Sequence, residues 1–370
     1  MNPLELHKGT IPYLDLRVRD DDERRLLLAA IEKVLQHGRI VLGPEVEQLE
    51  RALANQCGRQ FAVGVCSGTG ALYVALRACS IGPGCEVIVP AFSFVATANA
   101  VAMTGAKVVF ADVRDDLNVD PKSVAARMTS RTRAVVAVHL TGLIADMPAL
   151  EAITREHGVV LLEDAAQSFG ATAFGRPAGS FGALGCFSMN GMKVLASIGE
   201  AGAVVGDDAE LHERIQWLRY NGIVNKERCA APSLNFRLDT VQAAVLCVRF
   251  RRVDALLARR RAIAARFDET LSRFVSVPTV PTGATHSYYT YVIRTPAREP
   301  LREFLGERGI ETKVHFPKLI PDEPAFAQKS QPHVPNARRL TSEVLSLPNH
   351  EKLSDSDVSY IIDQVSAFFQ

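Results

Sequence analysis

The sequence has 370 residues, of which 47% are hydrophobic, and a formal net charge of +1. That length and that apolar share are enough for a large core and predict two unequal lobes. The near-zero charge and the lack of long basic or acidic runs argue against nucleic acid as a partner.

The start of the sequence, MNPLELHKGTIPYLDL, lacks the apolar core of a signal peptide, and no apolar run approaches the roughly 20 residues that span a bilayer. The seven cysteines form no CxxC pair and show no His–Cys metal spacing. We therefore expect a cytoplasmic protein with reduced thiols, no membrane contact and no metal site.

The first part of the chain leads to a glycine-rich turn. Residues 22–36 have helical periodicity, and a second helix follows after a short loop. The apolar run FAVGV (61–65) then leads into SGTG (67–70) and an Ala/Leu-rich helix. Free N–H groups at such a helix start favour a phosphate. The turn lacks the ending of a Walker loop and the third glycine of a dinucleotide fingerprint, so a purely structural turn stays an alternative.

Strands and helices alternate over the next hundred or so residues. EVIVP leads into the loop AFSF and a helix, and the apolar runs at 107–113 and 134–140 are predicted strands. Helices are expected around 120–128 and 146–157, and GAVVGD (202–207) adds a further strand. Such alternation predicts an α/β fold with a mainly parallel sheet and helices on both faces.

The stretch from residue 159 to residue 193 holds the best candidates for chemistry. Its run VVLL is typical of a buried strand and ends at Glu163 and Asp164, where open α/β sheets bind ligands. A second run, ALGCFSM, leads to Lys193. An acid and a lysine at neighbouring strand ends suit pyridoxal phosphate (PLP): the amine forms a Schiff base with the cofactor aldehyde, and the acid keeps the pyridine nitrogen protonated. A simple salt bridge is the alternative.

The remainder of the chain predicts a second, smaller unit. A helix is expected at 208–220, followed by a polar loop and another helix. The long basic helix at 250–271 is expected to link two lobes, with its arginines on the solvent side. The other predicted elements are a strand at 288–294 and helices at 300–308, 337–346 and 355–369. We therefore expect a large PLP-binding domain over residues 1–249 and a small α+β domain over residues 250–370.

Three linked blocks make the chain similar to a known family. They are DAAQ (164–167), FSMNGMK (187–193) and GEAGAVV (199–205), and the resemblance runs from about residue 10 to the C-terminus. The sequence resembles the DegT–DnrJ–StrS group of PLP-dependent aminotransferases, which mostly act on keto-sugars linked to nucleotides. The resemblance implies the type I fold of PLP-dependent transferases, as in aspartate aminotransferase. It also implies amino transfer from an amino acid such as L-glutamate to a keto-sugar.

The resemblance also implies roles for individual residues. Lys193 and Asp164 would be catalytic, the glycine-rich turn would hold the PLP phosphate, and Phe94 would stack on the cofactor ring. Asn235 would reach the phosphate bound to the other subunit, which implies a homodimer with shared active sites. The residues expected to bind the cofactor are Gly68, Thr69, Phe94, Asp164, Gln167, Ser188, Lys193 and Asn235. Arg237, His315 and Lys318 are candidates to bind the substrate, although each is also compatible with an ordinary surface or interface residue.

Several positions depart from the family pattern and leave the substrate open. GEAG stands at 199–202 where Gly-x-Gly-Gly is usual, and Asn221 and Tyr289 stand where histidine is frequent. The alternatives are a cyclitol or another ketone without a nucleotide, or a PLP-binding sensor without turnover. An NAD-dependent oxidoreductase is disfavoured because GxGxxG is missing. Family members that act as dehydratases carry histidine in place of the lysine, so Lys193 favours transamination.

Overall fold

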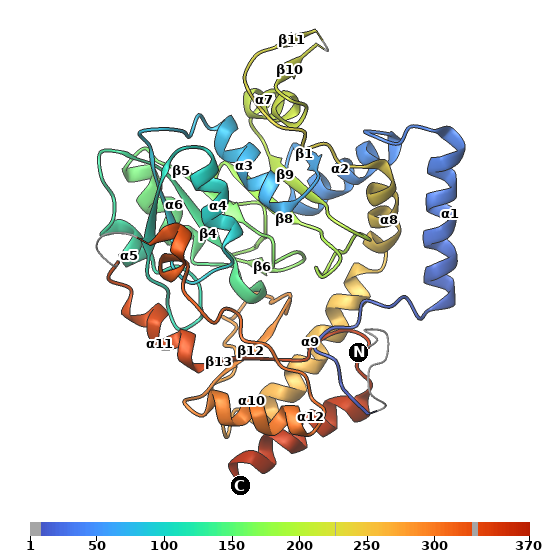
Figure 1. Cartoon of the computed structure of the whole chain (residues 1–370), viewed down its shortest axis with the longest axis vertical. Helices are drawn as coiled ribbons and strands as arrows, with labels where there is room; N and C mark the ends of the chain where they lie inside the picture. Colours follow the sequence, from blue (N-terminus) through green and yellow to red (C-terminus); the bar gives the residue numbers. More distant parts are fainter. Residues whose placement is uncertain (1–8, 226, 328–331) are drawn as a thin grey trace.

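The computed structural model describes residues 9–225, 227–327 and 332–370 of the chain. A large lobe is built around a central sheet, and helix α9 (Val253–Leu271) runs from it into a smaller lobe (Figure 1). The first eight residues, which belong to the sequence considered for a signal peptide, lie outside the described residues. Within the described residues, none of the helices is both long enough and apolar enough to span a bilayer.

The large lobe contains a seven-stranded sheet with the strand order β1–β9–β8–β5–β4–β2–β3. Neighbouring strands from β8 to β3 pair in parallel, whereas β9 pairs antiparallel with both β1 and β8. The prediction of a mainly parallel sheet is therefore confirmed. The strands are β1 (Phe61–Val65), β2 (Glu86–Pro90), β3 (Lys107–Ala111), β4 (Thr132–Val138), β5 (Val160–Asp164), β8 (Leu184–Ser188) and β9 (Gly202–Gly206).

Helices cover both faces of the sheet because alternate residues of each strand point to opposite sides. On β5, Leu162 joins one buried cluster and Leu161 joins the other. Helices on the Leu162 side are α3 (Gly68–Ala78), α4 (Ala96–Met103) and α7 (Ala209–Arg219). Helices on the Leu161 side are α2 (Pro44–Cys57), α5 (Pro121–Ala125), α6 (Met147–Glu156) and α8 (Thr240–Phe250). This two-sided packing fixes the carboxyl ends of the strands in place.

The small lobe has a hydrophobic core of its own. Strands β12 (Tyr291–Arg294) and β13 (Val344–Leu347) form an antiparallel pair that packs with α9, α10 (Arg298–Glu307) and α12 (Asp355–Phe369). Ile11 belongs to the same core, since it bridges to Ile310 and its backbone bonds to Gly309 and Glu311. The N-terminal segment thus packs with residues far beyond the predicted boundary at 249–250.

The other elements are short or lie at the edges. Helix α1 (Asp21–His37) lies along α8, and the hairpin of β10 (Ile223–Val224) and β11 (Arg228–Cys229) stands out from the large lobe (Figure 1). Smaller elements are β6 (Thr172–Ala173), β7 (Arg176–Pro177), α11 (Pro335–Glu343) and 3-10 turns at Leu140–Gly142, Ile320–Asp322 and Pro324–Phe326.

The basic helix differs from its prediction in two ways. It begins at Val253 rather than at residue 250, because α8 ends at Phe250 and a turn separates the two helices. The expectation that its arginines lie on the solvent side is wrong for Arg260, which is buried. The guanidinium of Arg260 is held inside the protein by hydrogen bonds to the carbonyls of Tyr288 and Asn349.

Candidate active site

Asp164 is the last residue of β5 and faces α4. Its Oδ2 accepts a hydrogen bond from the Thr97 hydroxyl at 2.7 Å, and its Oδ1 accepts one from the Ala166 N–H at 3.2 Å. Burial raises the pKa of this carboxyl, while the Thr97 bond and the charge of Lys193 act in the opposite direction. A cationic hydrogen-bond donor would stabilise the ionised form, and the protonated pyridine nitrogen of PLP is such a donor.

Glu163, the preceding acid, points to the opposite face of the sheet. Its Oε2 lies 2.7 Å from the Nε2 of His139 and accepts a hydrogen bond from the Gly179 N–H at 2.9 Å. The Nδ1 of His139 accepts from the Ala145 N–H, so the ring proton is on Nε2 and faces Glu163. Both side chains are fully buried. Glu163 therefore holds the glycine-rich link between β5 and β8 rather than the candidate site.

Lys193 lies in the turn that follows β8. Backbone hydrogen bonds from Met189 to Ala201 and from Gly191 to Gly199 close this turn. The Lys193 ammonium lies 4.2 Å from the centre of the Tyr289 ring, a cation–π contact. The charge of Lys193 also lowers the pKa of Asp164, although burial outweighs this effect. The structure thus brings the two predicted catalytic residues close enough to interact.

The turn before α3 meets the ends of β8 and β9 at very short range. A Cβ atom on Gly68 would lie 2.5 Å from the Cβ of Ser188, and one on Gly202 would lie 2.3 Å from the carbonyl oxygen of Ser67. Glycine is required at both positions to avoid these clashes. Thr69 is exposed in the first turn of α3. Because Gly68 packs against Ser188, the hydroxyls of Ser188 and Thr69 both lie near the N-terminus of α3. The positive end of the helix dipole there suits a phosphate.

A cavity of about 260 Å³ lies beside Lys193, and both lobes contribute to its wall. The Oε1 of Gln167 accepts a hydrogen bond from the Thr141 N–H at 2.7 Å, so the NH2 group of Gln167 is left for a ligand. Phe94, also in the wall, is 54% exposed. Its ring lies 5.8 Å from that of Phe316 and is available to stack on a planar cofactor.

The loop after α10 supplies His315 and Lys313 to the cavity wall, whereas Lys318 is exposed and is not part of that wall. Burial, with the positive charges of Lys313 and Lys193, lowers the pKa of His315 to about 4. The imidazole is therefore neutral at pH 7, and its Nδ1 lies 3.0 Å from the Ser346 hydroxyl. His315 can offer a hydrogen bond to an anionic substrate, but no positive charge.

Asn235 and Arg237 lie in the segment after the β10–β11 hairpin. The Nε of Arg237 donates to the Oδ1 of Asn235 at 2.9 Å, and its guanidinium lies 4.6 Å from the Tyr220 ring centre. Neither residue is among the described residues that line the cavity. Asn235 is exposed, and the neighbouring Leu234 is 58% exposed. Within one chain, the structure does not bring these two candidates to Lys193.

Several residues of the cavity wall escaped the sequence analysis. Tyr13 precedes α1, Lys313 follows α10, Thr290 precedes β12 and Asn349 follows β13. The family resemblance assigns a role to none of them, and only the folding of the small lobe brings them together. Thr97, which donates to Asp164, was also missed, because a threonine in an alanine-rich helix carries no signal of its own.

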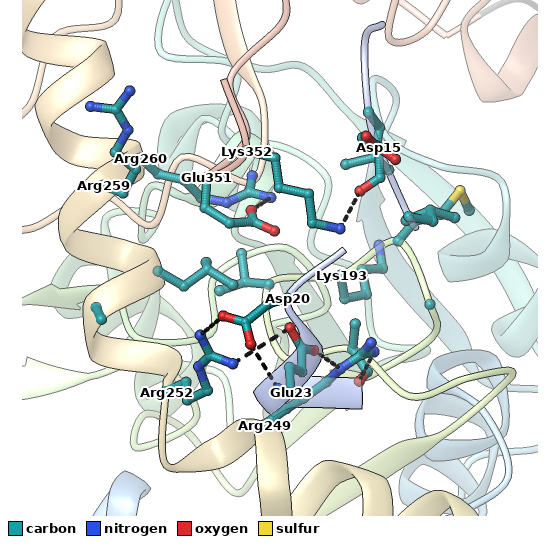
Figure 2. Close-up of a pocket in the computed structure, with 18 of the residues that line it drawn as sticks. Asp15, Asp20, Glu23, Lys193, Arg249, Arg252, Arg259, Arg260, Glu351 and Lys352 are labelled. Atoms are coloured by element: carbon teal, nitrogen blue, oxygen red, sulfur yellow. Dashed lines mark hydrogen bonds and ion pairs between the residues drawn. The ribbon is translucent and has the colours of Figure 1, made fainter. Parts of the chain in front are cut away.

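Lys193 also lines a second cavity of about 480 Å³, shown in Figure 2. Its wall is rich in charge, but most charges neutralise one another. Arg252 pairs with Asp20 at 3.0 Å, and Arg249 pairs with Glu23 at 3.1 Å. These pairs tie the start of α1 to the α8–α9 junction. The wall still carries seven lysines and arginines against four carboxylates, so it keeps a positive excess.

Known proteins are similar in sequence to this chain over nearly its whole length. A model of the DegT/DnrJ/EryC1/StrS aminotransferase family matches residues 21–366. A Streptomyces venezuelae protein named dTDP-3-amino-3,4,6-trideoxy-alpha-D-glucose transaminase is 39% identical over 96% of this chain and 95% of its own length. A Geobacillus stearothermophilus protein named pleiotropic regulatory protein is 35% identical over 97% of this chain and 99% of its own length.

The fold is also shared with a solved structure. The crystal structure of DesV from S. venezuelae, in complex with a ketimine intermediate, matches with a TM-score of 0.95 and 38% identity. The match covers 98% of this chain and 99% of that one. The expected type I fold of PLP-dependent transferases is thereby confirmed.

Proposed function

The chain belongs to the DegT/DnrJ/EryC1/StrS aminotransferase family, and we propose that it uses PLP to transfer an amino group from L-glutamate to a keto-sugar linked to a nucleotide. The observation that carries this proposal is that Lys193 and Gln167 line one cavity beside the ends of the parallel strands, where the charge of Lys193 also acts on the buried Asp164. The S. venezuelae relative, named for a 3-amino sugar on dTDP, supports a nucleotide-linked acceptor that is aminated at ring position 3.

The residues of the site fit the cofactor. PLP, when bound, supplies an electron sink for the bonds that change at the donor carbon. Lys193 would hold the cofactor covalently and, once displaced by the donor, would move the proton at the donor's α-carbon. Asp164 would keep the ring nitrogen protonated. The start of α3, with Gly68, Thr69 and Ser188, would bind the phosphate. Phe94 would cover the ring, and Gln167 would donate a hydrogen bond to the oxygen attached to the ring.

A PLP-binding sensor without turnover is the second candidate, because one relative is named a pleiotropic regulatory protein. A cofactor half-reaction separates the two. We expect a yellow PLP-bound protein whose colour is bleached by L-glutamate when no ketone is present. Mass spectrometry would then detect amination of 3-keto and 4-keto sugars on dTDP or UDP, with cyclitol ketones in the same screen. A protein that binds PLP but keeps its colour with glutamate would contradict the proposed transamination.

We further propose a homodimer in which Asn235 and Arg237 complete the partner's site. The support is that neither residue lines the cavity of its own chain and that Asn235 is exposed beside the exposed Leu234. Lys318 and His315 remain candidates for contacts with the acceptor. A division into domains near residue 250 is supported by the separate core of the small lobe. The seven free cysteines support a cytoplasmic location.

Mixing two inactive variants tests the shared site. Lys193→Ala and Asn235→Ala would each lose activity as homodimers. A heterodimer of the two contains one site with both residues intact, so random mixing should restore about a quarter of wild-type activity. The measurement is the glutamate half-reaction after refolding or co-expression, with each variant alone as the control. If Asn235 acts in its own subunit, the mixture would stay as inactive as its components.

A further inference from the structure

The small-lobe wall of the 260 Å³ cavity holds buried polar atoms without partners. They are the Oγ1 of Thr290, the Oδ1 and Nδ2 of Asn349, and the Nε of Arg260, each unpaired within the part of the chain that the structure describes. The three residues are 4%, 5% and 3% exposed, respectively, and all line the cavity beside Lys193. Buried polar groups in folded proteins are almost always paired, so a cluster of unpaired ones in a cavity wall indicates a ligand.

These residues are held firmly even though the atoms are unpaired. The Nη1 of Arg260 donates to the carbonyls of Tyr288 and Asn349 at 3.1 and 3.0 Å. The Thr290 N–H donates to the Thr141 carbonyl at 3.2 Å. Loose placement therefore does not account for the missing partners. The Asn349 amide can turn toward the cavity about its terminal torsion, which is soft, without any movement of its backbone.

The chemistry of this wall favours an uncharged ligand group. The guanidinium of Arg260 lies 3.2 Å from the Glu351 carboxylate, so its charge is already matched. What remains is a mixed set: Arg260 Nε–H and the Asn349 NH2 donate, Asn349 Oδ1 accepts, and the Thr290 hydroxyl does either. A hydroxyl or an acylamino group has both a donor and an acceptor and fits this set, whereas a phosphate only accepts.

We propose that Asn349, supported by Thr290 and Arg260, determines acceptor specificity by binding a hydroxyl or acylamino group on the sugar ring carbon next to the ketone. The inference rests on the proposed function, because it takes the acceptor ring to occupy this cavity. The enzyme would select against sugars that are deoxygenated at that carbon, since such a sugar leaves the buried amide of Asn349 unpaired in the complex.

The test compares Asn349→Leu with wild type on acceptor pairs that differ only at this carbon. We expect wild type to prefer the hydroxyl-bearing or acylamino-bearing acceptor over the deoxy acceptor by about ten- to a hundred-fold in kcat/KM. In N349L that ratio should fall toward one, mainly through loss on the polar acceptor. Separate hydroxyl and acylamino arms show which of the two groups is bound.

Stability gives a second measurement that does not depend on turnover. Asn118 is a matched control, because it is also buried but its Nδ2 donates to the Leu143 carbonyl and its Oδ1 accepts from the Leu140 N–H. N349L should leave the melting temperature of the PLP-bound, substrate-free protein unchanged or higher, since it removes unpaired atoms, whereas N118L should lower it. Calorimetry with the aminated product nucleotide should show about ten- to a hundred-fold weaker binding to N349L.

The possible outcomes separate this inference from the proposed function. If wild type aminates keto-sugars and N349L keeps the full preference for the polar acceptor, the inference is wrong and the proposed function stands. If N349L lowers the melting temperature as much as N118L does, the Asn349 amide stabilises the fold rather than waiting for a ligand, and the inference is wrong. A wild type that aminates none of the acceptors would overturn the proposed function, and the inference with it.

Discussion

Replacing Lys193 by alanine is expected to abolish transamination, with a loss in kcat of at least about 10³-fold. The amine of Lys193 lies at the junction of two cavities, and its charge acts on Asp164. An alanine would remove both the covalent attachment of the cofactor and the group that moves the proton. The measurements are the visible absorbance of the PLP-bound protein and the rate at which L-glutamate bleaches it.

Lys122→Ala is the matched control, because Lys122 is an exposed lysine on α5, near the end of β3. It should keep both the absorbance and the rate of wild type. If K193A were to turn over glutamate at the wild-type rate, the proposed role of Lys193 would be refuted, whatever the cofactor content of the variant.

Asp164→Asn is expected to slow the glutamate half-reaction by about 10²–10³-fold. The amide oxygen can still accept the hydrogen bond from Thr97, although its NH2 group then faces the Ala166 N–H, so the fold around α4 should persist with a modest loss of stability. It carries no negative charge, however, and cannot hold a proton on the cofactor's ring nitrogen. The readouts are single-turnover rates with glutamate and the absorbance spectrum of the bound cofactor as a function of pH.

Glu163→Gln provides the contrast, because this acid is adjacent in sequence but serves the other face of the sheet. Glu163 accepts hydrogen bonds from the backbone N–H groups of Gly179 and Phe181. A glutamine cannot accept from all of its partners at once, so E163Q should lose about 1–3 kcal/mol of stability while it keeps its cofactor spectrum. Equal losses of half-reaction rate in E163Q and D164N would mean that Asp164 acts through the fold rather than through its charge.

The sequence predicts the central sheet well, and it predicts that Asp164 ends one strand and Lys193 follows a neighbouring one, as they do in the structure. Buried strands are short apolar runs, and ligands bind where such strands end, so Asp164 and Lys193 can be singled out without coordinates. The exposure and the charge of individual side chains, in contrast, differ from what the sequence pattern suggests once the side chains are buried. Arg260 belongs to a basic helix, yet it is enclosed by the small lobe, and His315 is neutral at pH 7 because burial and the charges of Lys313 and Lys193 lower its pKa.

The wall that faces Lys193 could not be predicted from local patterns. Tyr13, Thr290 and Asn349 are far apart in sequence and meet only because the N-terminal segment and β13 pack in the same lobe. In the irregular loop after α10, spacing alone also cannot tell that Lys313 rather than Lys318 lines the cavity. Long-range packing decides both questions, and it leaves no periodic signal.

The packing of Ile11 and Tyr13 with the small lobe matters for protein engineering. The Tyr13 ring lies 5.7 Å from that of His315, so one lobe is assembled from both ends of the polypeptide. A chimera that exchanges only the residues after α8 would combine the tyrosine of one parent with the histidine of the other. Grafting a new acceptor preference between relatives therefore requires two crossover points, one before α1 and one after α8.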